Sequence, residues 1–207
     1  MNITVSKKKS SQYLSITEAI EAAAENSIIS VEPGVYNESI ILNKPLSIIG
    51  SGPRDKIIIQ SISDCCISIQ AGKSQLKGLS LINKKVHVDD DNYTVDVNNV
   101  EALIENCDIT GFSLACIGIY GSSANVSIKD CYIHDSVNSG IQFSNQAKGI
   151  VDGCNIQNKE NQYSSASPGI SIQKSKVTIQ NSIIENNNSG TYATSSEVKI
   201  KNCKIRY

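Results

Sequence analysis

The chain has 207 residues, which suits one domain of ordinary size. Its formal net charge is −1, with 19 basic and 20 acidic side chains, and this balance excludes a strongly basic surface for nucleic acid. Hydrophobic residues make up 40% of the sequence, enough for a packed core, but no apolar run reaches the ~20 residues that a membrane-spanning helix needs. We therefore expect a single domain over residues 1–207 that binds neither nucleic acid nor membrane.

The start of the chain and its cysteines bear on the cellular compartment. Residues 1–9 lack the apolar stretch of a secretory signal. There are seven cysteines, an odd number, and without a secretory signal they favour free thiols over a disulfide framework. The sequence therefore predicts a cytoplasmic protein.

The first predicted element is a short helix at residues 14–26. Ser15 and Glu18 fit a capping box, in which Ser occupies the N-cap and Glu lies three residues further on. Four apolar residues then share one helical face: Ile16, Ala19, Ile20 and Ala23. We expect this helix to cover one end of the fold and shield an exposed strand edge.

Short strands follow, beginning with residues 28–31. Further strands are predicted at 38–42, 46–49, 57–60, 67–70 and 76–81. Each is bounded by Gly, Pro, Asn or Ser, the residues that favour turns. This pattern indicates an all-β fold.

From residue 106 onward a four-residue phrase recurs five times, at intervals of 21 to 28 residues. The copies are Asn106-Cys107-Asp108-Ile109, Asp130-Cys131-Tyr132-Ile133, Gly153-Cys154-Asn155-Ile156, Asn181-Ser182-Ile183-Ile184 and Asn202-Cys203-Lys204-Ile205. A run with alternating apolar residues precedes each copy, and such strands bury their apolar face only by stacking coil on coil. We therefore predict a right-handed parallel β-helix of about 7 to 8 coils over residues 28–207.

The repeated cysteines share one register, so we expect Cys107, Cys131, Cys154 and Cys203 to stack inside as small hydrophobes. A metal site is the alternative, but the spacings are one coil each and no C-x-x-C motif is present. The asparagines at the turns are predicted to form a hydrogen-bonded ladder: Asn106, Asn155, Asn181 and Asn202.

Residues 16–52 resemble the N-terminal coil of the pectin-lyase-like superfamily. The matching pattern is a helix, a strand, P-G-x-Y-x-E, an apolar strand and K-P-L-x-I-x-G-x-G, carried by Gly34, Tyr36, Glu38, Pro45, Gly50 and Gly52. The later repeats look like carbohydrate-binding and sugar-hydrolase β-helix repeats. The resemblance implies the β-helix fold. It also implies relatives among polysaccharide lyases and among β-helix modules attached to F-box proteins or AAA-type ATPases. The catalytic motifs of the pectinase members are absent from the sequence.

The strongest catalytic candidates are Asp89, Asp90 and Asp91, with Lys85 shortly before them and Asp96 nearby. Carboxylate oxygens suit Ca²⁺, and a lysine can act as the base of a pectate-lyase-like reaction. The simpler interpretation is a solvated loop between two strands.

His134, followed by Asp135, is a second candidate, because a His beside a carboxylate can act as a general base. No nucleophile is placed beside it by the sequence, and the corresponding positions of other repeats are also polar. The alternative is therefore a polar turn position.

Two functions remain open. The first is a non-catalytic module that recognises a protein or a glycan, as the N-terminal part of a larger cytosolic protein such as an AAA-type ATPase. Its candidate contact residues are Tyr120, Tyr132, Tyr163 and Tyr192. The second is a polysaccharide lyase, or another carbohydrate-active enzyme, that acts on uronate-containing polysaccharide with Ca²⁺. No cofactor is expected under the first function.

The last repeat continues to Tyr207 without a capping element. A solenoid that ends in this way exposes a cross-section of its core and the edges of its strands. We expect either a further domain after this module or self-association through the C-terminal coil.

Overall fold

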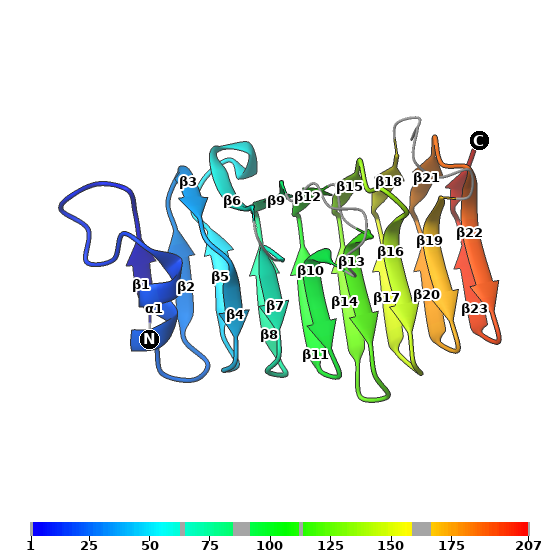
Figure 1. Cartoon of the computed structure of the whole chain (residues 1–207), viewed down its shortest axis with the longest axis horizontal. Coiled ribbons are helices and arrows are strands. Elements are labelled where there is room, and N and C mark those ends of the chain that lie inside the picture. The colour runs from blue at the N-terminus through cyan, green and yellow to red at the C-terminus, as the bar shows by residue number, and fades with distance from the viewer. Residues whose placement is uncertain (1, 63–64, 85–91, 112–113, 159–166, 207) are drawn as a thin grey trace.

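The computed structural model describes residues 2–62, 65–84, 92–111, 114–158 and 167–206. The described chain is a parallel β-solenoid, in which short strands stack from the N-terminal end to the C-terminal end along the long axis (Figure 1). The strands form three parallel sheets, named A, B and C, whose members are given below. From β3 (Gly34–Asn37) onward, successive strands join sheets B, C and A in turn, so three strands make one coil. The strands from β3 to β23 (Glu197–Lys201) form seven such coils, which confirms the predicted all-β solenoid of about 7 to 8 coils.

Sheet A contains nine described strands in the order β1 (Asn2–Val5), β2 (Ile28–Val31), β5 (Ser47–Gly50), β8 (Ser74–Lys77), β11 (Glu101–Glu105), β14 (Asn125–Lys129), β17 (Lys148–Asp152), β20 (Lys176–Gln180) and β23 (Glu197–Lys201). Sheet B contains eight: β3 (Gly34–Asn37), β6 (Ile57–Ser61), β9 (Ser80–Asn83), β12 (Asp108–Gly111), β15 (Tyr132–His134), β18 (Asn155–Gln157), β21 (Ile183–Glu185) and β24 (Lys204–Ile205). Sheet C contains seven: β4 (Ile40–Leu42), β7 (Ile67–Ile69), β10 (Tyr93–Asn98), β13 (Ala115–Tyr120), β16 (Ser139–Ser144), β19 (Pro168–Gln173) and β22 (Ser189–Thr194). A short 3₁₀ helix, η1 (Arg54–Lys56), precedes β6.

The N-terminal end is covered by α1 (Ile16–Ala22), which is shorter than the predicted 14–26. Ser15 is the N-cap as predicted, and Ile16 and Ile20 are buried beneath the helix. The first strand is β1, which precedes α1 in the chain and pairs with β2. The prediction that residues 28–31, which form β2, are the first strand is therefore wrong. Ile3 and Val5 of β1 are buried and extend the core to the cap. No described helix has the length and apolar character needed to span a membrane.

The core is built from rows of inward side chains that stack from coil to coil. In sheet A one such row runs through Ile48, Leu76, Ile104, Ile128, Val151 and Ile179, and all six are fully buried. The period-two alternation of the strands places every second residue in such a row. Ile172 belongs to a similar row in sheet C and is also fully buried.

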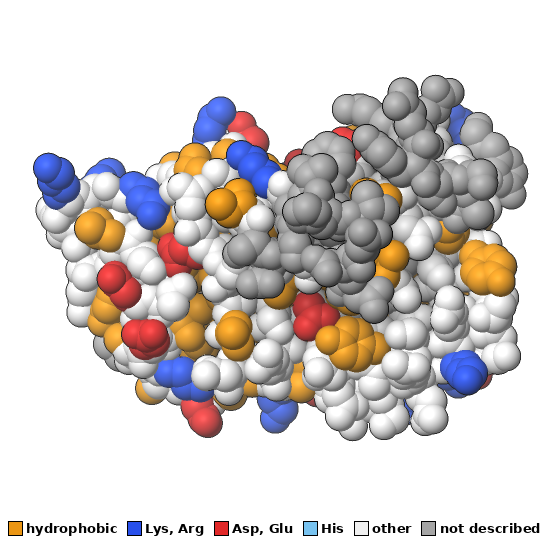
Figure 2. Space-filling view, in the orientation of Figure 1, with side chains coloured by type: hydrophobic (Ala, Val, Ile, Leu, Met, Phe, Trp, Pro, Cys, Tyr) orange, Lys and Arg blue, Asp and Glu red, His pale blue; other side chains and the backbone are white. Residues whose placement is uncertain are grey.

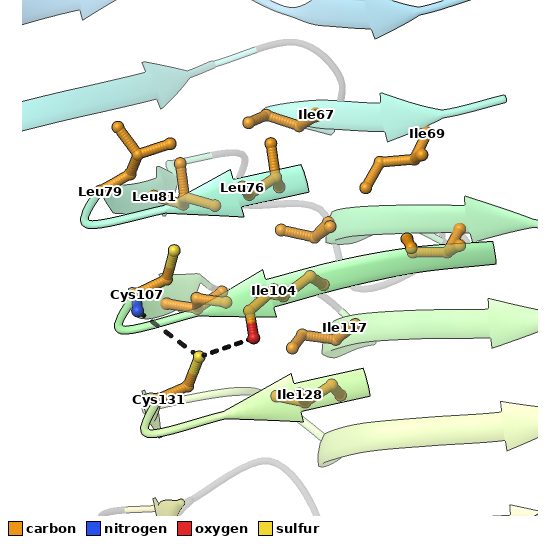
Figure 3. Packing of buried hydrophobic residues seen from close by; sticks show 14 of the residues in the cluster. Ile67, Ile69, Leu76, Leu79, Leu81, Ile104, Cys107, Ile117, Ile128 and Cys131 are labelled. Atoms are coloured by element: carbon orange, nitrogen blue, oxygen red, sulfur yellow. Dashed lines mark hydrogen bonds between the residues drawn. The ribbon is translucent and has the colours of Figure 1, made fainter. Parts of the chain in front are cut away.

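The repeated phrase lies at the corner between sheet A and sheet B. Cys107, Cys131 and Cys154 point inward there and are buried, whereas Cys203 in the last copy is half-buried. The backbone N–H of Cys107 donates to Sγ of Cys131 at 3.5 Å, and that thiol lies 3.7 Å from the Ile104 carbonyl oxygen (Figure 3). All seven cysteines of the chain are free. The prediction of an interior cysteine stack is confirmed for Cys107, Cys131 and Cys154, but Cys203 in the last coil is only partly covered.

The first residue of each phrase adopts a left-handed backbone, with φ between 50° and 65°. The predicted asparagine ladder is only partly present at this corner, where Asn202 Nδ2 donates to Asn181 Oδ1 at 3.5 Å. Asn106 instead accepts a bond from Arg54, and Asn155 lies within β18, so the prediction is wrong for these two.

Buried amides occur at a different corner, between sheets B and C. Asn158 Oδ1 accepts from the backbone N–H of Ser136 at 3.0 Å and from its hydroxyl at 2.8 Å. In the next coil, Asn187 Nδ2 donates to the carbonyls of Ile156 and Glu185. Satisfying buried backbone groups in this way stabilises the corner.

Candidate binding face on sheet C

Five of the predicted site residues lie outside the described residues: Lys85, Asp89, Asp90, Asp91 and Tyr163. The other four separate onto two faces. His134 and Tyr132 lie on the outer face of sheet B, whereas Tyr120 and Tyr192 lie on the outer face of sheet C.

On sheet B, His134 lies between two carboxylates. Its Nε2 is 3.0 Å from Asp108 Oδ1, and its Nδ1 is 2.8 Å from Asp135 Oδ2. The ring also stacks on Tyr132, with centroids 4.3 Å apart. Because both ring nitrogens face carboxylate oxygens, this geometry favours the doubly protonated imidazolium.

Burial opposes the charge on His134, but hydrogen bonds and attraction to Asp108 and Asp135 outweigh it and raise the pKa of the imidazole. The side chain is only 18% exposed. A general base must give up its proton at the working pH. A histidine held as the cation by two carboxylates is therefore poorly suited to that role.

The outer face of sheet A carries alternating charges. One row runs through Lys77, Glu105, Lys129, Asp152, Gln180 and Lys201 from coil to coil. Lys77 Nζ and Glu105 Oε1 are 2.8 Å apart, and Gln180 donates to Asp152 at 2.9 Å. Opposite charges at neighbouring positions stabilise such a sheet, so this row has a structural explanation.

The outer face of sheet C differs in charge. The described residues that line its two hollows include a single charged side chain, Asp96, whereas the hollow of about 340 Å³ on sheet A is lined by both Lys73 and Glu101. The larger hollow has a volume of about 530 Å³. Its lining residues are Leu114, Asn138, Ser139, Gln142, Pro168, Ser171, Gln173, Ser189 and Tyr192. Gln142 and Ser171 are partners in neighbouring strands, and Tyr192 follows in the next strand. This row presents amide and hydroxyl groups beside one exposed aromatic ring.

A second hollow of about 350 Å³ lies further toward the N-terminal end of the same face. Its lining residues are Cys65, Asn92, Tyr93, Asp96, Tyr120, Ser144 and Asn145. The rings of Tyr93 and Tyr120 lie 6.4 Å apart between centroids. Tyr120 therefore lines the second hollow, whereas the ring of Tyr132 stacks on His134 on another sheet.

Among the described residues that line the two hollows, Asp96 is the one carboxylate. Burial raises its pKa, and hydrogen bonds from the Tyr120 and Ser68 hydroxyls only partly offset this effect. In the sequence, Asp96 stands out only as a neighbour of the aspartate run at residues 89–91. Its position between Val95 and Val97 could have indicated a place on the outer face, because side chains along a strand point alternately inward and outward.

Metal-binding geometry is absent from the described part of the chain, where no three His, Cys, Asp or Glu side chains are grouped to hold an ion. The three buried thiols of the repeated phrase stack one per coil and contact backbone carbonyls. They are therefore part of the core.

Comparison with known proteins identifies the fold family. A family model described as "Right handed beta helix region" matches residues 56–207. The chain belongs to this right-handed β-helix family. The match fixes the handedness of the solenoid and agrees with the predicted pectin-lyase-like architecture.

Solved structures resemble the β-helix at low sequence identity. Pectin methylesterase from Aspergillus niger has a TM-score of 0.67 and 14% identity over 98% of this chain and 85% of its own. Pectin methylesterase from carrot has a TM-score of 0.69 and 15% identity, covering 98% and 82%. Alginate lyase from a Paenibacillus species has a TM-score of 0.74 and 11% identity, covering 98% and 75%. Likeness at such identities establishes the fold, which many activities share.

Proposed function

We propose that the β-helix is a non-catalytic recognition module that binds an uncharged polysaccharide along the outer face of sheet C. The observation that carries this proposal is the pair of hollows on that face, lined by amides, hydroxyls and tyrosines. Such groups donate and accept hydrogen bonds with sugar hydroxyls, and a tyrosine ring adds an apolar surface with a polar tip.

The extent of the face suits an extended ligand. The hollows span β10, β13, β16, β19 and β22, and both contact β16. Strands about 4.8 Å apart place the outermost two roughly 19 Å from each other. A chain of several sugars would lie across the strands and meet a row of side chains from each coil.

The charge of the face selects against an anionic ligand. None of the described residues that line the hollows is Lys, Arg or His, and Asp96 adds a negative charge when ionised. A polyuronate would therefore meet no compensating cation among them, and like charge costs binding energy. On the described part of the face in Figure 2, charged side chains are scattered among neutral ones without forming a basic band.

The same residues give little support for cleavage. Glycoside hydrolysis by the common mechanism requires two carboxyl groups at a defined separation, and the lining residues that the structure describes supply one. The hydroxyl of Tyr120 already donates a hydrogen bond to that carboxylate. We therefore infer that the module holds its ligand without transforming it.

Titration calorimetry with a panel of neutral oligosaccharides tests the proposal. Gln142→Ala and Tyr192→Ala should each weaken binding about tenfold, the effect of losing one good polar or stacking contact. Thr178→Ala, on the outer face of sheet A, is the matched control and should leave the affinity unchanged. Failure of every neutral oligosaccharide to bind would overturn the proposal.

A second candidate, a carbohydrate-active enzyme on uronate-containing polysaccharide, is favoured by the raised pKa of Asp96 within a hollow. A carboxyl whose pKa is raised by burial holds its proton to a higher pH and can serve as a general acid. Incubation with polygalacturonate and Ca²⁺ would then yield an unsaturated product that absorbs ultraviolet light. Asp96→Asn should abolish that product. If Lys85 is the base and Asp89, Asp90 and Asp91 bind Ca²⁺, as predicted, their substitution by alanine should abolish it as well.

We also propose that the module works in the cytoplasm as part of a larger protein, such as an AAA-type ATPase. The seven free thiols support a reducing compartment. The proposed attachment to a larger protein rests on the resemblance of the repeats to β-helix modules that are attached to such proteins. Localisation of the tagged natural protein, and its size on a denaturing gel, test the two parts of this proposal.

A further inference from the structure

The two ends of the solenoid differ in how well they cover the core. At the N-terminal end, Ile16 and Ile20 of α1 lie over the first coils and are buried. At the C-terminal end, Ile179 and Ile184 are fully buried, but their partners one coil further on, Ile200 and Ile205, are 47% and 38% exposed. The last coil therefore presents core positions to solvent.

The strands of that coil also present a free edge. β22, β23 and β24 each end the strand order of their sheet, so no described strand pairs with their outer side. An unpaired edge with apolar side chains beside it is a template for pairing with another chain.

The two ends of β23 carry side chains of opposite charge. Glu197, Lys199 and Lys201 alternate with Val198 and Ile200 along the strand. Glu197 contacts Lys176 at 2.9 Å and Lys199 at 3.5 Å within its own chain.

Lys201, at the other end of β23, has no carboxylate partner among the described residues. One end of the free strand thus carries an acidic side chain, and the other carries an unpaired basic one.

We propose that two copies of this chain associate end to end through their C-terminal coils, around a two-fold axis. In this arrangement β23 of one copy pairs antiparallel with β23 of the other, centred on Lys199. Val198 then faces Ile200 of the second copy, and Glu197 faces Lys201 of the second copy, each contact occurring twice. An isologous contact of this kind closes on itself and limits the assembly to a dimer.

The solenoid cross-section extends the contact beyond one strand. A two-fold axis through the middle of sheet A exchanges sheets B and C, so β24 of each copy lies against β22 of the other. Ile205 and the end of the core would then be covered from both sides. The two Lys199 side chains meet at the axis, where each retains its own Glu197.

Sedimentation of the 207-residue chain over a range of concentrations tests the association. The wild-type chain should form a dimer, and Ile200→Glu should raise the dissociation constant at least about tenfold by placing a charge in the contact. Ile150→Glu is the matched control, because Ile150 is similarly exposed, at 43%, on the outer face of sheet A. A wild-type chain that stays monomeric throughout would overturn the proposal and leave the free edge to another protein or a further segment.

Charge exchange tests the antiparallel register. Glu197→Lys alone and Lys201→Glu alone each place like charges opposite one another and should dissociate the dimer. An equimolar mixture of the two variants restores both opposite-charge pairs and should form a heterodimer. A mixture that stays monomeric, or single variants that dimerise like the wild type, would contradict this register. Circular dichroism confirms that each variant is folded.

Discussion

Glu38 holds the start of helix α1, because its Oε1 accepts a hydrogen bond from the backbone N–H of Ile16 at 3.0 Å. Its Oε2 accepts three more, from the Thr17 N–H at 2.8 Å, the Thr17 hydroxyl at 2.8 Å and the Ser15 hydroxyl at 2.9 Å. Two parts of the N-terminal pattern, the helix start and the P-G-x-Y-x-E segment, are thereby joined. The carboxylate satisfies donors that a helix N-terminus leaves free and complements its dipole.

Glu38→Gln is expected to destabilise the N-terminal cap. The amide retains one acceptor oxygen but loses the charge, so the free energy of unfolding should fall by about 1–3 kcal/mol. Chemical denaturation measures this loss. Glu25→Gln, at an exposed position just beyond the helix, is the control and should have little effect. Equal stability of the Glu38 variant and the wild type would show that the cap does not depend on this carboxylate.

Ile172→Ala should remove one buried rung of the core. Ile172 is fully buried, and large-to-small changes at such sites cost about 2–5 kcal/mol. The control is Ile150→Ala, at an exposed position on sheet A, which should change stability by less than about 0.5 kcal/mol. A loss below about 1 kcal/mol for Ile172→Ala would mean that the inward face of β19 is misassigned.

His134 should make stability depend on pH. Because the pKa of His134 is raised above its ordinary 6.5, the folded chain binds this proton more tightly than the unfolded chain. The stabilisation is complete below pH 6.5 and is lost as the pH rises through the raised value. The difference in unfolding free energy between wild type and His134→Asn should therefore shrink from pH 6 to pH 9. A difference that grows with pH would contradict the paired imidazolium.

The thiols should divide into two classes toward alkylating reagents. Burial raises the pKa of Cys66 to about 12, and burial likewise raises the pKa of Cys116. The thiolate is the reactive form. Cys65 and Cys203 are half-buried, so mass spectrometry of the native chain at pH 8 should find them modified first. Equal labelling of Cys116 and Cys203 would contradict the described packing.

Most of the fold could be predicted from the repeat, because each coil contacts only its neighbours in the sequence. The shared register of Cys107 and Cys131 was sufficient to predict an interior stack, which the structure confirms. Partners distant in sequence were not predictable in this way. Ser15 was correctly placed at the N-cap, but the carboxylate that binds the helix start belongs to Glu38, 23 residues further on.

The site was harder to predict than the fold. Asn is typical of turns, but its presence does not say which corner of a coil is buried. The prediction therefore chose the asparagines of the repeated phrase and missed Asn158, which is buried at the corner between sheets B and C. Tyr120 and Tyr192 were predicted as contact residues, and both line hollows on sheet C. Gln142 was missed as a member of this face, because its partners Ser171 and Tyr192 come from later coils.

The most direct test of the central claim measures binding and cleavage in one sample. A fluorescently end-labelled neutral oligosaccharide is titrated with the chain, its anisotropy is recorded, and its length is then determined by chromatography. The account predicts a rise in anisotropy that Tyr192→Ala weakens, with the oligosaccharide recovered at full length. Shortened oligosaccharide, or binding that Tyr192→Ala leaves unchanged, would contradict recognition without catalysis on the outer face of sheet C.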